Sequence, residues 1–277
     1  MKTEFFNSLP ITRPASLRGP VAAVGYGWRW LGTALSFVLF GAGSILLGIV
    51  VVPLVSLASR DPAQRLQRVR GIIGGALRFF IVVTRHAGLM SYEVEGLENM
   101  VAGRSYLIVA NHPTLIDAVF LLAFFPMADC VIKEGMARNF FTRHLVRAAN
   151  YIPNADPVAL LDAAVARLKS GRSLILFPEG TRTVPGAPLC FKPGAAAVAV
   201  RSGRECLPVV IRCEPMTLSK SDRWYRIPPR RAGFSISVQP PVAPAQVIGA
   251  EPVSRYANRS FNAWLQAYFS ARLAGPG

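Results

Sequence analysis

The first third of the chain is dominated by one long apolar run. Residues 31–59 carry no charged side chain, and about 20 apolar residues suffice to cross a bilayer as a helix. A cleaved signal peptide is a poor match, because its apolar core spans only about 7–15 residues and an A-x-A-like cleavage site is missing here. The run therefore predicts a membrane segment that stays in the mature protein.

The flanks of this run leave its orientation open. Basic residues lie on both sides of it: Lys2, Arg13, Arg18 and Arg29 before, and Arg60, Arg65, Arg68 and Arg70 after. Because both flanks are positive, the charge asymmetry that usually sets topology is missing. Gly41, Gly43, Gly48 and Pro53 are candidate helix breakers. We therefore favour a re-entrant or reclining segment, with both flanks on the cytoplasmic face, over one straight span.

A second segment, residues 62–86, has the pattern of an amphipathic helix. Apolar residues recur at helical spacing at Leu66, Val69, Ile73, Leu77, Phe80 and Val83. Arg65, Arg68 and Arg78 lie among them. Such a helix either lies in the membrane interface or packs on a protein core, and the pattern is compatible with both.

From about Ser91 onward, short β-rich runs alternate with helical patterns. The expected strands are Tyr92–Val94, Tyr106–Ala110, Cys130–Lys133, Ser173–Phe177, Leu207–Arg212 and Phe234–Val238. Helical patterns fall near residues 115–125, 136–149, 157–170, 194–202 and 253–273. This alternation predicts an α/β domain with a mixed sheet flanked by helices. Functional loops are expected where the strands end.

Composition narrows the class of partner. A chain of 277 residues suits one catalytic domain with a modest appendage. The 31 Lys and Arg against 15 Asp and Glu give a net charge of +16, which suits anionic lipids or an acidic carrier protein. A nucleic-acid partner is not expected, because no nucleic-acid motif accompanies the basic excess. The four cysteines form no CxxC or Cys/His zinc spacing, so we expect no metal site and no disulfide framework.

The most informative polar motif directly follows the apolar run YLIVA. It reads Asn111-His112-Pro113-Thr114-Leu115-Ile116-Asp117. On a regular helix His112 and Asp117 would diverge, so we place His112 just before a helix that begins at Pro113, with Asp117 reaching back to the imidazole. The carboxylate would fix the tautomer and leave the other ring nitrogen to accept a proton from an alcohol. In isolation such a pair is more often a helix cap.

Motifs further along the chain favour a catalytic pair over a helix cap. The run SLILF leads into Pro178-Glu179-Gly180-Thr181-Arg182-Thr183, and Phe191-Lys192-Pro193-Gly194-Ala195-Ala196 opens a helical pattern. The ordered set NH-x4-D, FPEGTR, FKPGAA and LPVVI resembles the glycerolipid acyltransferase family, which includes the 1-acylglycerol-3-phosphate acyltransferases. The resemblance covers residues 91–240.

This resemblance implies a role for each matching residue. His112 is the expected general base and Asp117 its orienting partner. The expected substrate-binding residues are Asn111, Glu179, Gly180, Thr181, Arg182 and Lys192. Arg182 suits an anionic headgroup, because a guanidinium binds phosphate or carboxylate oxygens bidentately. Lys192 either adds to this positive pocket or is a solvated surface lysine.

One stretch departs from the family pattern. Many family members that use lysophosphatidic acid carry an arginine where this chain has Tyr151–Pro157, which contains none. An acceptor without phosphate, such as a lyso-ornithine lipid or an aryl-polyene-type lipid, therefore stays open. Basic and aromatic residues also cluster at 223–231 (RWYRIPPRR), a composition found at lipid headgroups and in ordinary exposed loops.

The resemblance implies transfer of a fatty acyl group from acyl-CoA or acyl-carrier protein to a lysophospholipid hydroxyl, with no cofactor or metal. Residues 1–90 would be a membrane-associated helical segment and residues 91–277 the α/β acyltransferase domain. We expect a bacterial protein of the inner (cytoplasmic) membrane, with the catalytic domain facing the cytoplasm and membrane lipids as partners. A lipid hydrolase using the same dyad and a non-catalytic membrane-binding protein are the rival interpretations.

Overall fold

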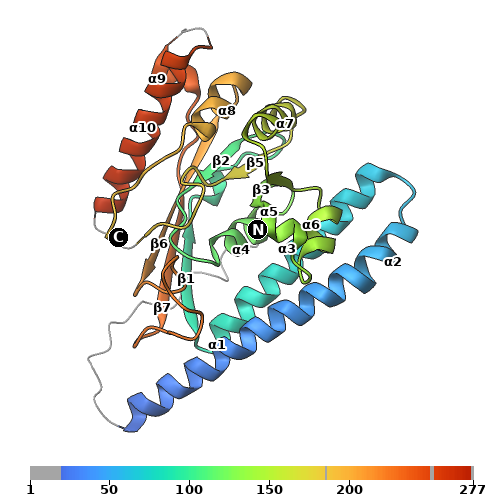
Figure 1. Cartoon of the computed structure of the whole chain (residues 1–277), viewed down its shortest axis with the longest axis vertical. Helices are drawn as coiled ribbons and strands as arrows, with labels where there is room; N and C mark the ends of the chain where they lie inside the picture. The colour runs from blue at the N-terminus through green and yellow to red at the C-terminus, as the bar shows by residue number, and fades with distance from the viewer. Residues whose placement is uncertain (1–19, 185, 250–252, 276–277) are drawn as a thin grey trace.

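A computed structural model describes residues 20–184, 186–249 and 253–275 (Figure 1). Within these residues, one sheet has the strand order β1-β7-β6-β2-β5-β3-β4. The strands are β1 (Met90–Glu95), β2 (Leu107–Ala110), β3 (Asp129–Lys133), β4 (Ile152–Asn154), β5 (Leu174–Leu176), β6 (Cys206–Glu214) and β7 (Ala232–Val238). The basic flank residues Lys2, Arg13 and Arg18 lie outside the described residues.

The sheet is mixed, as the sequence predicts. Strand β6 pairs in parallel with β2, which pairs in parallel with β5, and β3 and β4 continue the parallel set. Strand β7 is antiparallel to β6 and parallel to β1. Because β2 and β5 are parallel neighbours, their carboxyl ends meet at the same edge, and the loops carrying His112 and Glu179 start side by side there.

Helices cover both faces of the sheet. The helices are α1 (Pro20–Leu46), α2 (Val52–Leu57), α3 (Pro62–His86), α4 (Asp117–Phe124), α5 (Glu134–Arg138), α6 (Arg143–Ala148), α7 (Pro157–Lys169), α8 (Gly194–Ser202), α9 (Pro244–Ile248) and α10 (Arg255–Ala274), with a 3₁₀ turn η3 (Leu97–Asn99). One apolar core joins α4 and part of α3 to the strands. A second core lies among α7, α8, α10 and the opposite face.

The long apolar run folds as one continuous helix rather than a broken one. Helix α1 passes through a π-helical turn, η2 (Leu47–Val51), directly into α2. The expectation that the glycines and Pro53 break the run is therefore wrong. Pro53 stands at the start of α2, just after the π turn has shifted the hydrogen-bond register, so its missing N–H is tolerated. Ala23–Leu57 is the one described helix long and apolar enough to cross a membrane, and only 11% of its most apolar stretch is buried.

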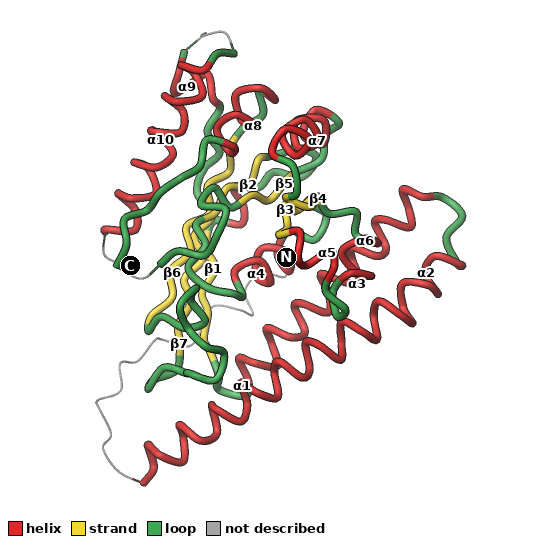
Figure 2. The backbone as a smooth tube through the Cα atoms, in the orientation of Figure 1, coloured by secondary structure: helices red, strands yellow, loops and turns green. Residues whose placement is uncertain are grey.

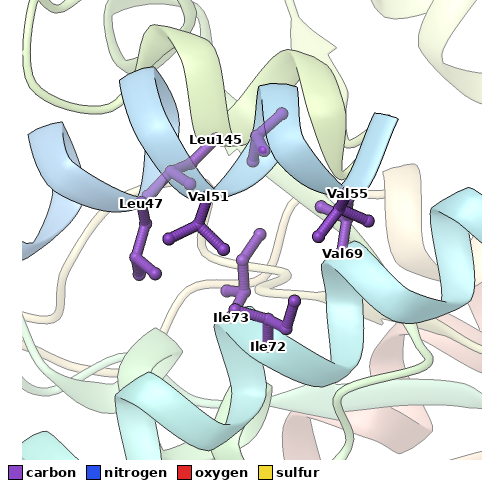
Figure 3. Close-up of a pocket in the computed structure, with 8 residues that line it drawn as sticks. Leu47, Val51, Val55, Val69, Ile72, Ile73 and Leu145 are labelled. Atoms are coloured by element: carbon purple, nitrogen blue, oxygen red, sulfur yellow. The ribbon is translucent and has the colours of Figure 1, made fainter. Parts of the chain in front are cut away.

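Helix α3 returns alongside α1 and α2 as the second arm of a hairpin (Figure 2). Its predicted apolar face packs inward, with Val69, Ile73 and Ile81 buried. Figure 3 shows Ile72 and Ile73 facing Val51 of the preceding arm. Core packing therefore holds for one side of α3, while Phe79 on the same helix is 62% exposed.

Helix α1 lies along the α/β domain and does not project away from it. Near its start, Trp28 Nε1 donates to the carbonyl oxygen of Ala87 at 2.8 Å, and Arg29 donates to that of Pro229 at 2.6 Å. Further along, Phe37 meets Trp224 edge to face with ring centroids 5.7 Å apart. The contacts of Arg29 and Phe37 join the apolar helix to the cluster at 223–231.

Several helix boundaries differ from the sequence expectations. The pattern at 136–149 forms two short helices, because the Asn139 side chain accepts from the Phe141 amide and the Thr142 hydroxyl donates to the Met136 carbonyl. The short strand β4 and helix α9 were not expected. The six expected strands are present, with ends shifted by at most two residues.

Candidate active site

Asn111 fixes the end of the strand that delivers the histidine. Its amide nitrogen donates to the carbonyl oxygen of Ile211 at 2.7 Å, and its carbonyl oxygen accepts from the Ile211 amide at 2.8 Å. The side chain is buried and so continues the pairing between β2 and β6 past the last residue of β2. Asn111 is thus tied to the sheet, which differs from the substrate-binding place expected for it.

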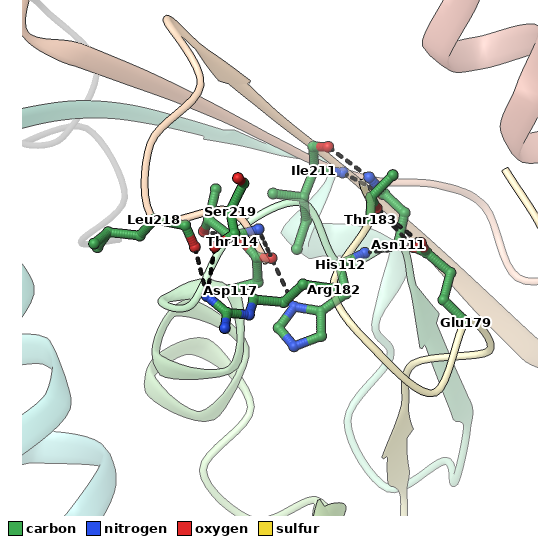
Figure 4. Close-up of polar contacts among 10 residues, drawn as sticks. All are labelled: Asn111, His112, Thr114, Asp117, Glu179, Arg182, Thr183, Ile211, Leu218 and Ser219. Carbon is green, nitrogen blue, oxygen red and sulfur yellow. Dashed lines mark hydrogen bonds and ion pairs between the residues drawn. The ribbon is translucent and has the colours of Figure 1, made fainter. Parts of the chain in front are cut away.

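His112 and Asp117 form the expected pair. The Nδ1 atom of His112 lies 2.8 Å from Oδ2 of Asp117. The carboxylate is fully buried, whereas the imidazole side chain is 19% exposed. The Nε2 atom has no hydrogen-bond partner among the described residues, and Figure 4 shows it on the side of the ring away from Asp117. The ring is therefore oriented by one nitrogen and presents the other to the surface.

The turn that joins the pair differs from the expected helix start. Helix α4 begins at Asp117, so the placement of Pro113 at the first helical position is wrong. Residues 114–116 form a turn instead, stabilised because Asp117 accepts from the Thr114 amide at 2.7 Å and from its hydroxyl at 2.5 Å. An acidic side chain at a helix start also suits the helix dipole. Asp117 therefore accepts three hydrogen bonds, two from Thr114 and one from His112.

Glu179 supports the histidine from the neighbouring strand. Its Oε1 atom accepts from the His112 amide at 2.9 Å, and the Thr183 hydroxyl donates to Oε2 at 2.8 Å. The Thr183 amide in turn donates to the His112 carbonyl oxygen at 2.7 Å. Glu179 is buried, so it acts on the His112 backbone and does not face an open pocket. Direct acceptor binding by Glu179 stays a prediction.

Phe177 packs on the other side of the imidazole. The two rings stack with centroids 4.2 Å apart and an interplanar angle of 22°. Phe177 is the last residue before Pro178 of the FPEGTR motif, so the β5 end supplies both a ring wall and a carboxylate. The imidazole is therefore held by Asp117 at Nδ1 and by Phe177 against one face.

The remaining motif residues lie at the rim. Arg182 Nη1 donates to the carbonyl oxygens of Leu218 and Ser219, at 2.8 and 2.9 Å. Gly180 has a φ of +66°, and a Cβ built there would lie 3.1 Å from the Lys192 ammonium, so glycine leaves room for that side chain. Lys192 and Thr181 are exposed. Arg182 and Lys192 thus bring two positive charges to the edge beside His112.

Burial shifts the acidity of both carboxyl groups. It raises the pKa of Asp117 above its ordinary value, and the hydrogen bonds with His112 and Thr114 oppose that rise. The pKa of Glu179 is also raised by burial, against hydrogen bonds from the His112 amide and Thr183. A carboxylate held beside Nδ1 stabilises the imidazolium that forms when Nε2 accepts a proton.

Sequence reasoning overlooked five contributors to this site: Thr114, Phe177, Thr183 and the carbonyl groups of Leu218 and Ser219. The two threonines and the phenylalanine lie inside or next to the motifs, where a polar or aromatic neighbour is a usable signal. The carbonyls at 218 and 219 carry no side-chain signal at all, because any residue supplies them.

Comparison with known proteins relates the central part of the chain to one family. A family model described as Acyltransferase matches residues 91–212, the stretch that contains His112, Asp117, Glu179 and Arg182. These residues therefore match an acyltransferase domain. The 1-acyl-sn-glycerol-3-phosphate acyltransferase of Pseudomonas aeruginosa is 28% identical to it over 186 residues, which are 64% of this chain and 69% of the relative. The Helicobacter pylori enzyme of the same name is 31% identical over 133 residues, 46% of this chain and 53% of the relative.

A solved structure shares the fold of this acyltransferase. The crystal structure of the 1-acyl-sn-glycerophosphate (LPA) acyltransferase PlsC from Thermotoga maritima aligns with a TM-score of 0.67 at 22% identity. The alignment covers 90% of this chain and 99% of the other. It therefore includes the N-terminal hairpin as well as the sheet. The relatives are O-acyltransferases, and this chain is an enzyme of that kind.

Proposed function

We propose that this acyltransferase moves a fatty acyl group from an acyl thioester onto the hydroxyl of a lysophospholipid such as 1-acylglycerol-3-phosphate, with His112 as general base and Asp117 as its orienting partner. The donor is acyl-CoA or an acylated carrier protein. The observation that carries the proposal is the imidazole held by Asp117 at Nδ1, with Nε2 unpaired at the carboxyl edge of β2 and β5.

The chemistry needs one base and no covalent enzyme intermediate. Nε2 of His112 removes the acceptor hydroxyl proton as the oxygen attacks the thioester carbonyl carbon. The tetrahedral intermediate then collapses, the carbon–sulfur bond breaks, and the imidazolium returns the proton to the departing thiolate. Glu179 and Phe177 hold the His112 backbone and ring, so little reorganisation is needed between the two proton transfers.

Two rim cations support an anionic acceptor. Arg182 uses only Nη1 for the carbonyls of Leu218 and Ser219, so its remaining N–H donors make no hydrogen bond among the described residues. Lys192 adds an ammonium beside Gly180. Together they would bind a phosphate monoester without an arginine in Tyr151–Pro157. Tyr151–Pro157 contains no arginine, and Arg182 already donates to two carbonyl oxygens. A hydroxyl lipid without phosphate is therefore the second candidate acceptor.

Membrane association fits the hairpin. We propose that α1 and α2 recline in the cytoplasmic leaflet of the inner membrane, since contacts at Trp28, Arg29 and Phe37 hold the apolar helix along the domain. Large apolar side chains along it are exposed, among them Leu35 at 53% and Val38 at 66%. A reclining helix keeps those side chains in lipid while His112 faces acceptors that lie in the same leaflet.

The test is product analysis by mass spectrometry. Purified wild type is given acyl-CoA or acylated carrier protein with 1-acylglycerol-3-phosphate, lyso-ornithine lipid or no acceptor. We expect phosphatidic acid from the wild type and none from His112→Ala, while His86→Ala, an exposed histidine far along α3, retains activity. Acylation of lyso-ornithine lipid alone would transfer the assignment to the second acceptor. Free fatty acid as the main product without acceptor would make the protein a hydrolase, and an active His112→Ala would remove the dyad from the mechanism.

A further inference from the structure

The end of the hairpin remote from His112 carries a cavity rich in arginine. It has a volume of about 550 Å³ and lies between the α2–α3 turn and the segment from α6 to β4. Figure 1 shows that turn at the right-hand end of the hairpin, beside α6. Arg172, which lines it, precedes β5. The cavity therefore belongs to the amino ends of β3 and β5, whereas the catalytic motifs follow carboxyl ends.

The lining combines positive charge with apolar surface. Arg65, Arg147 and Arg172 line the cavity, and no carboxylate does. Leu66, Val69 and Ala148 contribute its apolar part. This composition selects a ligand with an anionic group and a hydrocarbon part.

Among the described residues, only one of the three lining arginines has an ion-pair partner. The buried Asp129 carboxylate already pairs with Arg70 at 2.6 Å and with Arg172 at 2.7 Å, and Arg167 lies 3.7 Å away. One negative charge thus faces three arginines. Arg65 and Arg147 make no side-chain hydrogen bond or ion pair with any described residue. An anion in the cavity would relieve this excess.

The neighbouring surface indicates where such a ligand comes from. Leu54 and Leu57, which flank the lining residue Ser56, are 60% and 83% exposed. They end the apolar helix that we place in lipid, and exposed leucines beside a cationic cavity match the two parts of a phospholipid. We infer that this cavity binds the phosphate of an anionic phospholipid, whose acyl chains lie against Leu54 and Leu57. The inference rests on the proposed membrane association but not on the proposed reaction.

Binding can be measured without catalysis. The full-length protein in a non-ionic detergent is titrated with dioctanoyl phosphatidylglycerol by calorimetry, with no acyl donor present. The pocket variant is Arg65→Gln/Arg147→Gln. Its matched control is Arg204→Gln/Arg259→Gln, which removes two exposed arginines outside the cavity and so loses the same charge. We expect the lipid to bind the pocket variant at least about tenfold more weakly than the wild type, and the control within about twofold of it.

Two further variants and a competition with inorganic phosphate test which ligand binds and whether loss of charge causes the weakening. Arg65→Lys/Arg147→Lys should keep most of the affinity, because the charge remains. His112→Ala should bind like the wild type, which separates this site from the catalytic edge. Equal weakening in pocket and control variants would overturn the inference, since only overall charge would then matter. Complete displacement of the lipid by an equal concentration of inorganic phosphate would also overturn it, in favour of a free-anion site.

Discussion

The catalytic edge, the loops after β2 and β5 that carry His112 and Glu179, buries polar side chains, whereas the N-terminal hairpin exposes apolar ones. At the edge, polar side chains are buried: Asn111, Asp117 and Glu179 each lie at 7% exposure or less. On the hairpin, apolar side chains are exposed, with Val24 at 73% and Leu57 at 83%. Buried polar groups cost free energy unless they are hydrogen-bonded, and exposed apolar patches in a monomer mark a binding surface.

The difference teaches how each region is stabilised. Every buried polar group named at the edge has partners within the protein, so the edge is complete before substrate arrives. The apolar helix is exposed over most of its length, and under the proposed membrane association lipid would cover it. The first region should therefore respond to mutation through catalysis, and the second through membrane binding.

The largest effect is expected at Asp117. Asp117→Asn removes the negative charge that stabilises the imidazolium and disturbs the tautomer of His112, so kcat/KM should fall on the order of 10³-fold. Thr114→Val, which removes only the hydroxyl contact to the same carboxylate, should cost less than about tenfold. Steady-state kinetics measure both. If Asp117→Asn keeps more than about a tenth of the wild-type kcat/KM, catalysis does not depend on the His112–Asp117 pair.

The contact between the hairpin and the amino end of β3 should respond through stability. Arg70 is 3% exposed, and besides Asp129 it donates to the Ala149 and Met127 carbonyl oxygens. Arg70→Gln leaves Asp129 buried with a partner missing, which costs about 3–5 kcal/mol and lowers the unfolding temperature by roughly 10 °C.

The matched control for Arg70 is an exposed ion pair. Arg104 and Glu205 lie 3.3 Å apart with side chains 61% and 34% exposed, so Arg104→Gln should change stability by less than about 1 kcal/mol. Thermal unfolding in detergent compares the two variants. Equal shifts would mean that the buried pair does not join hairpin and sheet.

Substitution of two similarly exposed valines should affect membrane binding differently. Val38 on α1 is 66% exposed and Val158 on α7 is 69% exposed. Val38→Ser should weaken partitioning into phospholipid vesicles about tenfold, whereas Val158→Ser should leave it unchanged. Vesicle co-sedimentation measures the partition. If both variants partition into vesicles equally, α1 does not lie in the bilayer.

The smallest effect concerns pH. Burial raises the pKa of Glu179, so its folded-state pKa exceeds the unfolded value and the stability it contributes is lost as pH rises through the folded pKa. Glu179→Gln keeps an acceptor for the His112 amide but cannot ionise. The unfolding temperature of this variant should therefore rise relative to that of the wild type as pH rises from about 4 to 7. A difference that does not change with pH would show that the carboxylate is not penalised by burial.

The sequence predicts the sheet better than the details of the site. Short apolar runs locate six strands because strand burial leaves a local signal: β2 and β5 are continuous buried runs, whereas β7 alternates between buried and half-buried positions. Strand β4 was not expected, since Ile152–Asn154 contains one buried residue and a proline. The split between α5 and α6 depends on side chains of Asn139 and Thr142 that compete with helical hydrogen bonds, which a count of apolar residues does not register.

Within the site, spacing and chemistry identified the His112–Asp117 contact but not its surroundings. The position of Asp117 relative to the ring follows from a turn made by Thr114, whereas the spacing alone predicts a helix beginning at Pro113. Substrate binding by Glu179 and Arg182 stays a prediction. Their hydrogen bonds to backbone groups were not predicted, because no local pattern reveals which distant carbonyl an arginine will meet.

The hydrogen bond from Arg29 to Pro229 joins residues 200 positions apart. At a synthesis rate of about 5–20 residues per second, Arg29 leaves the ribosome roughly 10–40 s before its partner exists. During that interval the apolar surface of α1 has no domain to lie on. Under the proposed membrane association, this order of synthesis favours contact of the helix with lipid first, and the catalytic domain would assemble on it afterwards.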